Sequence, residues 1–159
     1  YYYKKIGIMM RPLKKKEDFI HKDKNSQSES KNEKPSFQDR VQILLIDDDL
    51  EFLELLSESL KEEFDVLITN DGKKGLQIFK ERSPDLVITD IFMPKIDGLK
   101  LTHLINQYGS TPVIVLSGYT KELKTLEKEL LKQESILILQ KPIKISELLV
   151  EIKKILRLF

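Results

Sequence analysis

The stretch LVITDIFMPKIDG (residues 86–98) joins a run of apolar and β-branched residues to a carboxylate, Asp90, and then to a turn-like segment that ends in Asp97-Gly98. Such a run before an acid is typical of a buried strand that ends at a polar group. Asp90 alone has two interpretations, because an acid can begin a turn or cap a helix, or it can be a reactive group. The rest of the chain decides between them.

Short apolar runs of the same kind recur along the chain, and they are too continuously apolar for a sheet with one wet face. They are VQILLI (41–46), VLITN (66–70), DLVITD (85–90), PVIVLS (112–117) and SILILQ (135–140). Segments with apolar residues at helical spacing alternate with these runs, and we assign their stripes to core packing. The stripes are Leu53, Leu56, Leu60, Phe64; Leu76, Ile78, Phe79; Leu101, Leu104, Ile105, Tyr108; Leu123, Leu126, Leu130; and Ile145, Leu148, Leu149, Ile152, Ile155. This alternation predicts an α/β fold with a parallel sheet and helices on both faces.

Composition divides the chain into two parts. Residues 1–40 carry 11 Lys and Arg against 6 Asp and Glu, whereas residues 41–159 carry 16 against 20. The segment 21–40 offers almost nothing to bury, so we predict that 1–40 is a basic, disordered extension or linker. The folded part is acidic, which argues against nucleic-acid binding through general charge. Because the chain has no cysteine and no apolar run of membrane-spanning length, we expect a cytoplasmic protein without a membrane span.

Polar groups end four of the five predicted strands, where an open α/β sheet binds its ligands. The first strand ends in Asp47-Asp48-Asp49, the third in Asp90, the fourth in Ser117-Gly118 and the fifth in Lys141-Pro142. Each group alone has an ordinary explanation as a helix cap, a turn or a solvated lysine. We expect Asp49 and Asp71 to cap helices, and Asp97-Gly98 to form a turn or a cap.

The strand-end groups considered together favour chemistry. If the first and third strands are neighbours, Asp47, Asp48 and Asp90 converge, and each pair of carboxylates about 4 Å apart repels by about 4 kcal/mol. Carboxylates gathered in this way suit a hard divalent cation such as Mg²⁺. Asp90 would then attack a phosphoryl group whose oxygens Lys141 and Ser117 contact.

These residues resemble the response-regulator receiver domain, the CheY-like family of two-component signalling. The resemblance covers 41–159 and rests on LLIDDD, PDLVITDIFMPKIDG, PVIVLSG and LQKPI, in the family's order. It implies a flavodoxin-like (βα)5 fold with strand order 2-1-3-4-5. It also implies phosphorelay signal transduction without other enzymatic activity, in which a sensor histidine kinase or a phosphotransfer protein supplies the phosphoryl group.

The resemblance assigns a role to each site residue. Asp90 is the expected phosphoacceptor, and Mg²⁺ is expected on Asp47, Asp48, Asp90 and the backbone carbonyl of Phe92. Ser117 is expected to move toward the phosphoryl group, for which Gly118 leaves room. Lys141 is expected to bind phosphate, with a cis bond to Pro142. The signalling surface is expected within 119–157, where it could also form a homodimer.

The sequence departs from the family pattern at a few positions. Ile138 stands where the family often has Tyr or Phe, whose rotamer reports phosphorylation and so acts as part of the switch. Glu134-Ser135 replaces a Gly-Ala pair, and Gly75 stands where Ala is common. These departures leave the site residues in place and put the aromatic part of the switch in doubt. Phe92 and Tyr119 are expected beside the site, where they could slow attack of water on an aspartyl phosphate.

Several alternatives remain open at this point. A haloacid-dehalogenase-like phosphatase would use Asp47 as nucleophile with Asp49, but its motif requires Thr or Val where Glu51 stands. A pseudo-receiver would keep the fold as a protein-binding module and never accept phosphate. The chain could also be the receiver portion of a hybrid kinase or of a larger regulator, or a single-domain protein that starts at Met9 or Met10.

Overall fold

The computed structural model describes residues 40–118 and 135–157. The strands in this part are β1 (Gln42–Ile46), β2 (Asp65–Thr69), β3 (Leu86–Asp90), β4 (Val113–Ser117) and β5 (Ile136–Gln140). The helices are α1 (Leu50–Leu60), α2 (Gly72–Arg82), α3 (Gly98–Asn106) and α5 (Ile145–Leu156). The predicted tail up to residue 39, the predicted helix around Leu126 and the predicted access residue Tyr119 lie outside the described residues.

In the described part, the five strands form one parallel sheet in the order β2-β1-β3-β4-β5. Ile46 of β1 pairs with Thr69 of β2 and with Thr89 of β3, and Asp90 pairs with Leu116 of β4. The carboxyl ends of these strands therefore lie along one edge of the sheet. This arrangement confirms the predicted flavodoxin-like architecture and the strand order that the resemblance implied.

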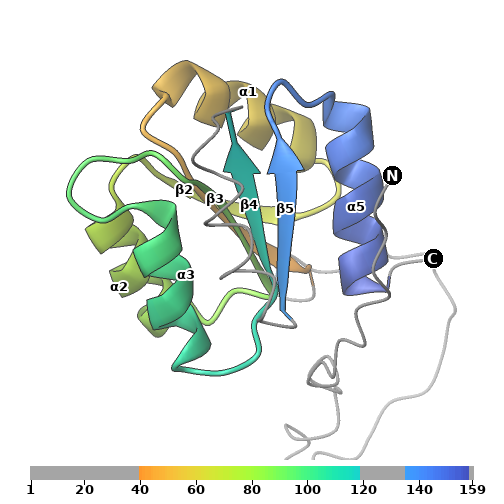
Figure 1. Cartoon of the computed structure of the whole chain (residues 1–159). Coiled ribbons are helices and arrows are strands. Elements are labelled where there is room, and N and C mark those ends of the chain that lie inside the picture. The colour runs from red at the N-terminus through yellow and green to blue at the C-terminus, as the bar shows by residue number, and fades with distance from the viewer. Residues whose placement is uncertain (1–39, 119–134, 158–159) are drawn as a thin grey trace, which may run out of the picture.

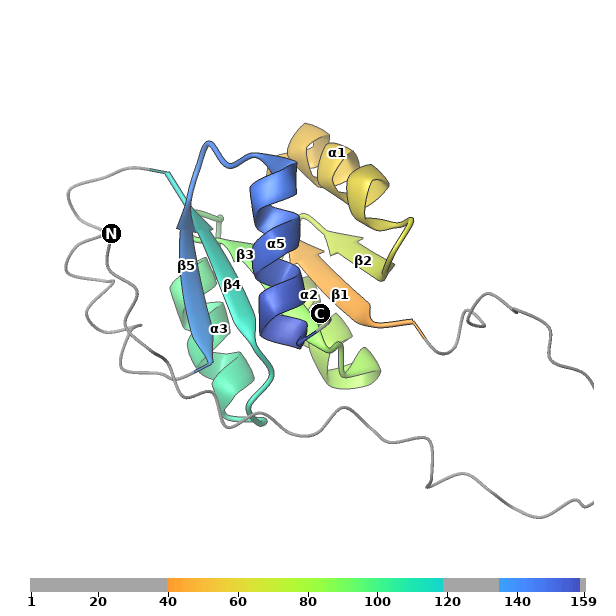
Figure 2. The same cartoon turned by 90° about the vertical axis from the view of Figure 1, so that its right-hand side faces the viewer.

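The helices cover both faces of the sheet. Alternate residues of each strand point to opposite faces, and the buried residues accordingly divide into two clusters. One cluster joins the sheet to α1 and α5, and the other joins it to α2 and α3. Figure 1 shows α5 on one side of the sheet with α2 and α3 on the other, and Figure 2 looks onto α5. Since β1, β3 and β4 are covered on both faces, their runs are continuously apolar.

Aspartates begin three of the helices, as predicted. The carboxylate of Asp49 accepts a hydrogen bond from the backbone N–H of Phe52 at the start of α1. Asp71 and Asp97 cap α2 and α3 in the same way. Each cap satisfies N–H groups that lack partners in the first turn of a helix.

The predicted core residue Tyr108 lies at the surface. Tyr108 was assigned to the stripe of the third helix, but its side chain is 54% exposed. The reason is that α3 ends at Asn106 and Gln107 is its C-cap, so the helical spacing no longer holds at Tyr108. The ring instead lies edge-on to Phe79 and beneath the ammonium of Lys80.

Candidate functional site

Asp90 lies at the carboxyl end of β3, in the middle of the sheet, and is 7% exposed. Its Oδ2 accepts a hydrogen bond of 2.6 Å from the backbone N–H of Phe92, two residues further on. The backbone N–H of Ile91 donates to the carbonyl of Leu116 on β4, which continues the strand pairing past Asp90. The first bond holds the carboxylate, and the second fixes the backbone that follows Asp90 at the edge of the sheet where β3 ends.

Lys141 connects this carboxylate to the first strand. Its ammonium lies 2.8 Å from Oδ1 of Asp90 and 2.6 Å from Oδ2 of Asp47. Lys141 directly follows β5, and its backbone N–H donates to the carbonyl of Ser117 at 2.7 Å. Three strand ends that are far apart in the sequence thus meet at one nitrogen atom.

Burial and charge act against each other at this centre. Burial is the largest influence on Asp47 and raises its pKa above the usual value, although hydrogen bonds from Lys141 and from the backbone of Asp49 oppose it. Burial alone would lower the pKa of Lys141, but its hydrogen bonds to Asp47 and Asp90 raise it. Lys141 therefore stays charged at neutral pH and neutralises part of the acidic pair.

Asp48 does not join the contacts between Asp47, Asp90 and Lys141. Asp47 is 3% exposed, whereas the next residue, Asp48, is exposed at the surface. In the ranges 40–118 and 135–157, no three acidic or histidine residues are grouped closely enough to hold a metal ion by themselves. Of the three carboxylates that were expected to converge, Asp47 and Asp90 do so and Asp48 does not. The reason is that successive side chains after a strand point in different directions.

The remaining donors still suit Mg²⁺. Asp47 and Asp90 supply hard oxygen ligands with more negative charge than one ammonium offsets. Mg²⁺ keeps several of its waters and needs only one or two carboxylates from a protein. Asp48 lies beside Asp47 in the sequence and is exposed to solvent, so it is available to such a hydrated ion.

The other expected site residues are arranged as follows. Ser117 is 2% exposed, and its hydroxyl donates to the carbonyl of Gly118 at 2.8 Å. The bond between Lys141 and Pro142 is cis, as the resemblance implied. Ile138 is half-buried on β5 and packs against the cluster on the α2 and α3 face. Phe92 is 49% exposed.

Two residues that contact the site were not identified from the sequence. A methyl group on Gly98 would lie 2.0 Å from the carbonyl oxygen of Asp90, so only glycine allows α3 to start this close to the end of β3. The ammonium of Lys141 also lies 4.6 Å from the centre of the Phe52 ring, at a cation–π distance. The Asp97-Gly98 pair predicts a turn or a cap but gives no sign of the close approach to Asp90, and nothing in the sequence links Phe52 to Lys141.

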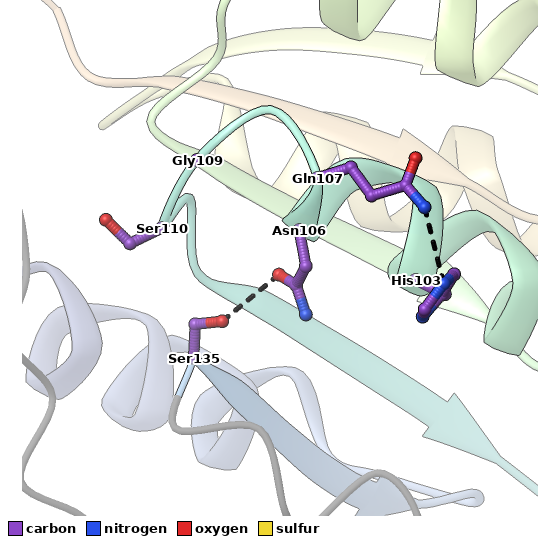
Figure 3. Close-up of a pocket in the computed structure, with 6 residues that line it drawn as sticks. All are labelled: His103, Asn106, Gln107, Gly109, Ser110 and Ser135. Carbon is purple, nitrogen blue, oxygen red and sulfur yellow. Dashed lines mark hydrogen bonds between the residues drawn. The ribbon is translucent and has the colours of Figure 1, made fainter.

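A pocket of about 480 Å³ lies at the opposite end of the sheet, where the strands begin. Figure 3 shows its lining at the end of α3, in the loop before β4 and just before β5. Ser135 donates a hydrogen bond to Asn106 there, and the side chains of Gln107 and His103 are 3.4 Å apart. Among the described residues that line this pocket there is no carboxylate, so the chemistry of this lining differs from that of the site around Asp90.

None of the described helices is both long enough and apolar enough to cross a bilayer.

Comparison with known proteins agrees with this fold. The family model for the response regulator receiver domain matches residues 43–153. The transcriptional regulatory protein CpxR of Escherichia coli (strain K12) is 38% identical over 117 residues, which make up 72% of this chain and 49% of CpxR. The sensor histidine kinase TmoS of Ectopseudomonas mendocina is 32% identical over 73% of this chain, but over only 12% of TmoS.

A solved structure supports the same assignment. The response regulator receiver domain protein from Clostridium thermocellum superposes with a TM-score of 0.67 at 29% identity, covering 74% of this chain and 94% of that chain. The chain spans about half the length of CpxR. Family model, relatives and fold all agree, and the chain belongs to the response regulator receiver domain family of two-component systems.

Proposed function

We propose that the chain transmits a signal by accepting a phosphoryl group on Asp90 from a phosphohistidine. The donor is a sensor histidine kinase or a phosphotransfer protein. The observation that supports this proposal most is the pair of buried carboxylates, Asp47 and Asp90, bridged by the ammonium of Lys141. Two neighbouring carboxylates with a single counter-charge are costly to bury, and folds retain such groups at functional sites.

The transfer is a displacement at phosphorus. A carboxylate oxygen of Asp90 attacks the phosphorus atom, the new O–P bond forms, and the P–N bond to the imidazole breaks. The imidazole nitrogen keeps the electron pair and later binds a proton. The ammonium of Lys141, now 2.8 Å from Asp90, would follow the charge onto the phosphoryl oxygens, where it offsets their repulsion with Asp47.

Mg²⁺ would supply further neutralisation of the phosphoryl oxygens when it is bound. Its proposed ligands are Asp47, Asp48, Asp90 and the backbone carbonyl of Phe92. Ser117 would turn its hydroxyl from the carbonyl of Gly118 toward a phosphoryl oxygen. Gly118 has room for this change, because a methyl group there would have no described atom within 4 Å.

The output is a shift between two conformations of one surface. Phosphorylation adds negative charge next to Asp47 and withdraws Lys141 from its present contacts. This change favours a different arrangement of the loops that follow the strands at the site. We assign this surface to β5, α5 and the segment 119–134, with Ile138 replacing an aromatic switch residue. Homodimers or partner proteins would dock there.

The relatives contain this domain in two architectures. CpxR is a regulator about twice the length of the matched segment, and TmoS is a kinase in which the match is a small part. We propose a regulator acting in the cytoplasm, with the receiver portion of a hybrid kinase as the alternative. We further propose that the domain itself binds no nucleic acid and catalyses no reaction beyond its own phosphorylation and dephosphorylation.

Intact mass after incubation with acetyl phosphate and Mg²⁺ tests the proposal. The wild type should gain the mass of one phosphoryl group, and Asp90→Asn should not. Asp97→Asn is the matched control, because asparagine still caps α3 and the variant should gain the adduct. A folded wild type that neither gains the adduct nor binds Mg²⁺ would instead be a pseudo-receiver. Hydrolysis of p-nitrophenyl phosphate that depends on Asp47 and not on Asp90 would favour the phosphatase alternative.

A further inference from the structure

The loop between β3 and α3, residues 91–97, carries the backbone groups that contact Asp90. The backbone N–H of Phe92 donates to the Asp90 carboxylate at 2.6 Å, and the carbonyl of the same residue is the proposed metal ligand. The loop is closed at its base by a hydrogen bond of 2.9 Å from the N–H of Gly98 to the carbonyl of Ile91. The position of Phe92 therefore depends on what holds the outer part of this loop.

The start of α2 holds the outer part of the loop. The ammonium of Lys95 lies 3.0 Å from Oδ2 of Asp71, the N-cap of α2. Gly72 and Ile96, which follow Asp71 and Lys95 in the sequence, are also in close contact. A methyl group on Gly72 would lie 2.6 Å from the carbonyl oxygen of Ile96. Glycine at this position lets the loop approach the helix closely enough for the ion pair to form.

The two oxygens of Asp71 have separate partners. Oδ1 accepts hydrogen bonds from the backbone N–H groups of Lys73 and Lys74, at 2.8 and 3.1 Å. Oδ2 faces Lys95, and the hydrogen bond from that ammonium is the largest reason why the pKa of Asp71 is lowered. One side chain thus caps α2 and holds the loop, and the two roles are separable by substitution.

The backbone at Lys95 is unfavourable for a lysine. Its φ is 71°, in the left-handed region that glycine and asparagine tolerate better than residues with long side chains. Strain of this kind is retained where the surrounding structure gains from it. Here the gain is the ammonium, since neither glycine nor asparagine can reach Asp71 with a positive charge.

We propose that Lys95 and Asp71 are positioning residues for phosphoryl acceptance, which hold the β3–α3 loop against α2 and thereby fix the Phe92 backbone beside Asp90. This proposal rests on the proposed function, because it gives the two residues a role in forming the Mg²⁺ and phosphoryl site. They act through the loop and contact neither the phosphoryl group nor the ion. Their removal lowers Mg²⁺ affinity more than it lowers the rate of phosphorylation at saturating Mg²⁺.

The test uses variants that separate the ion pair from the cap. Asp71→Asn keeps an oxygen for the N–H groups of α2 and loses the charge, and Lys95→Asn loses the ammonium while tolerating the positive φ. Lys95→Arg keeps a positive charge and should behave as the wild type. The matched control is Lys153→Gln, which removes a similar ion pair between α5 and Glu63, in the turn after α1.

Two measurements are made on each variant. Amide hydrogen exchange of Phe92 in the metal-free protein should accelerate about threefold in each asparagine variant, within the range that exposed ion pairs supply. Mg²⁺ affinity should fall by about the same factor, and the double variant should lose no more than either single variant. Lys153→Gln should leave both values unchanged, and high salt should reduce the difference between wild type and variants.

The results distinguish this proposal from the function on which it rests. Unchanged Phe92 exchange in both asparagine variants, or losses that add fully in the double variant, would overturn the role of the ion pair. A wild type that binds no Mg²⁺ and accepts no phosphoryl group would overturn the proposed function. The exchange measurement would then still show whether Lys95 and Asp71 hold the loop.

Discussion

Replacing Lys141 with methionine tests whether its ammonium makes the buried acidic pair tolerable. Lys141→Met keeps an unbranched side chain of similar length and removes the charge. Asp47 and Asp90, whose side chains are 4% and 9% exposed, then face each other without a counter-charge. Because both contacting oxygens lie within 2.8 Å of the same nitrogen, they are about 5 Å apart or less.

The size of the effect follows from this separation. At about 5 Å and an effective dielectric near 20, two carboxylates repel by about 3 kcal/mol. Solvent reduces this value, since the side chain of Lys141 is 25% exposed. Proton uptake by one carboxyl would cost about 4 kcal/mol at pH 7, which is more than this repulsion, so it does not reduce the loss at that pH. We therefore expect Lys141→Met to lose about 2–3 kcal/mol of unfolding free energy, or about 10 °C in Tm.

Urea unfolding of the metal-free protein, followed by far-ultraviolet circular dichroism, measures this loss. The difference from wild type should shrink toward pH 5, where protonating one carboxyl costs less than about 2 kcal/mol. The control is Lys153→Met, which removes the exposed ion pair with Glu63 and should change stability by less than about 1 kcal/mol. A Lys141→Met protein as stable as the wild type at pH 7 in EDTA would refute the reasoning.

Further substitutions test other features of the site. Asp47→Asn should raise the Tm of the metal-free protein by a few degrees, because burial disfavours the charged form. Asp47 has a higher pKa in the folded protein than its ordinary value of 3.8. Its contribution to stability therefore falls as the pH rises from 3.8 through the folded-state pKa. In acid, where the carboxyl is protonated, the thermal melts of Asp47→Asn and the wild type should converge. Gly98→Ala should lose about 2–3 kcal/mol in urea unfolding, because its methyl group would lie 2.0 Å from the carbonyl oxygen of Asp90. Gly118→Ala, with no described atom within 4 Å, should stay within about 0.5 kcal/mol of wild type in the same assay. Equal losses for the two glycine variants would contradict the packing argument.

The strands and helix starts were predictable because their signals are local. Each strand of the sheet was predicted to within one residue of its observed ends, since a β-branched apolar run needs burial on both faces. Asp49 and Asp71 were predictable as caps, because a carboxylate before an apolar helical stripe satisfies the first free N–H groups of the helix. Tyr108 was predicted wrongly, since periodicity alone does not show where a helix ends.

The contacts between strand ends were predictable only in part. Lys141 and Asp47 are separated by 94 positions, and the strand order brings them only to the same edge of the sheet, with β3 and β4 between β1 and β5. The side-chain directions do not follow from that order, so the exposure of Asp48 was not foreseen. The contact of Phe52 with Lys141 depends on how α1 packs against the sheet, which no local pattern encodes.

The sequence by itself determined the fold class, the order of its elements and the residues that end each strand, because hydrophobic period and capping chemistry act over a few neighbouring residues. The tertiary structure decided which of those residues meet. It placed one ammonium between Asp47 and Asp90, left Asp48 in solvent and joined Lys95 to Asp71. These outcomes depend on distances of a few ångströms between separate elements, and only packing of the whole sheet and its helices sets such distances.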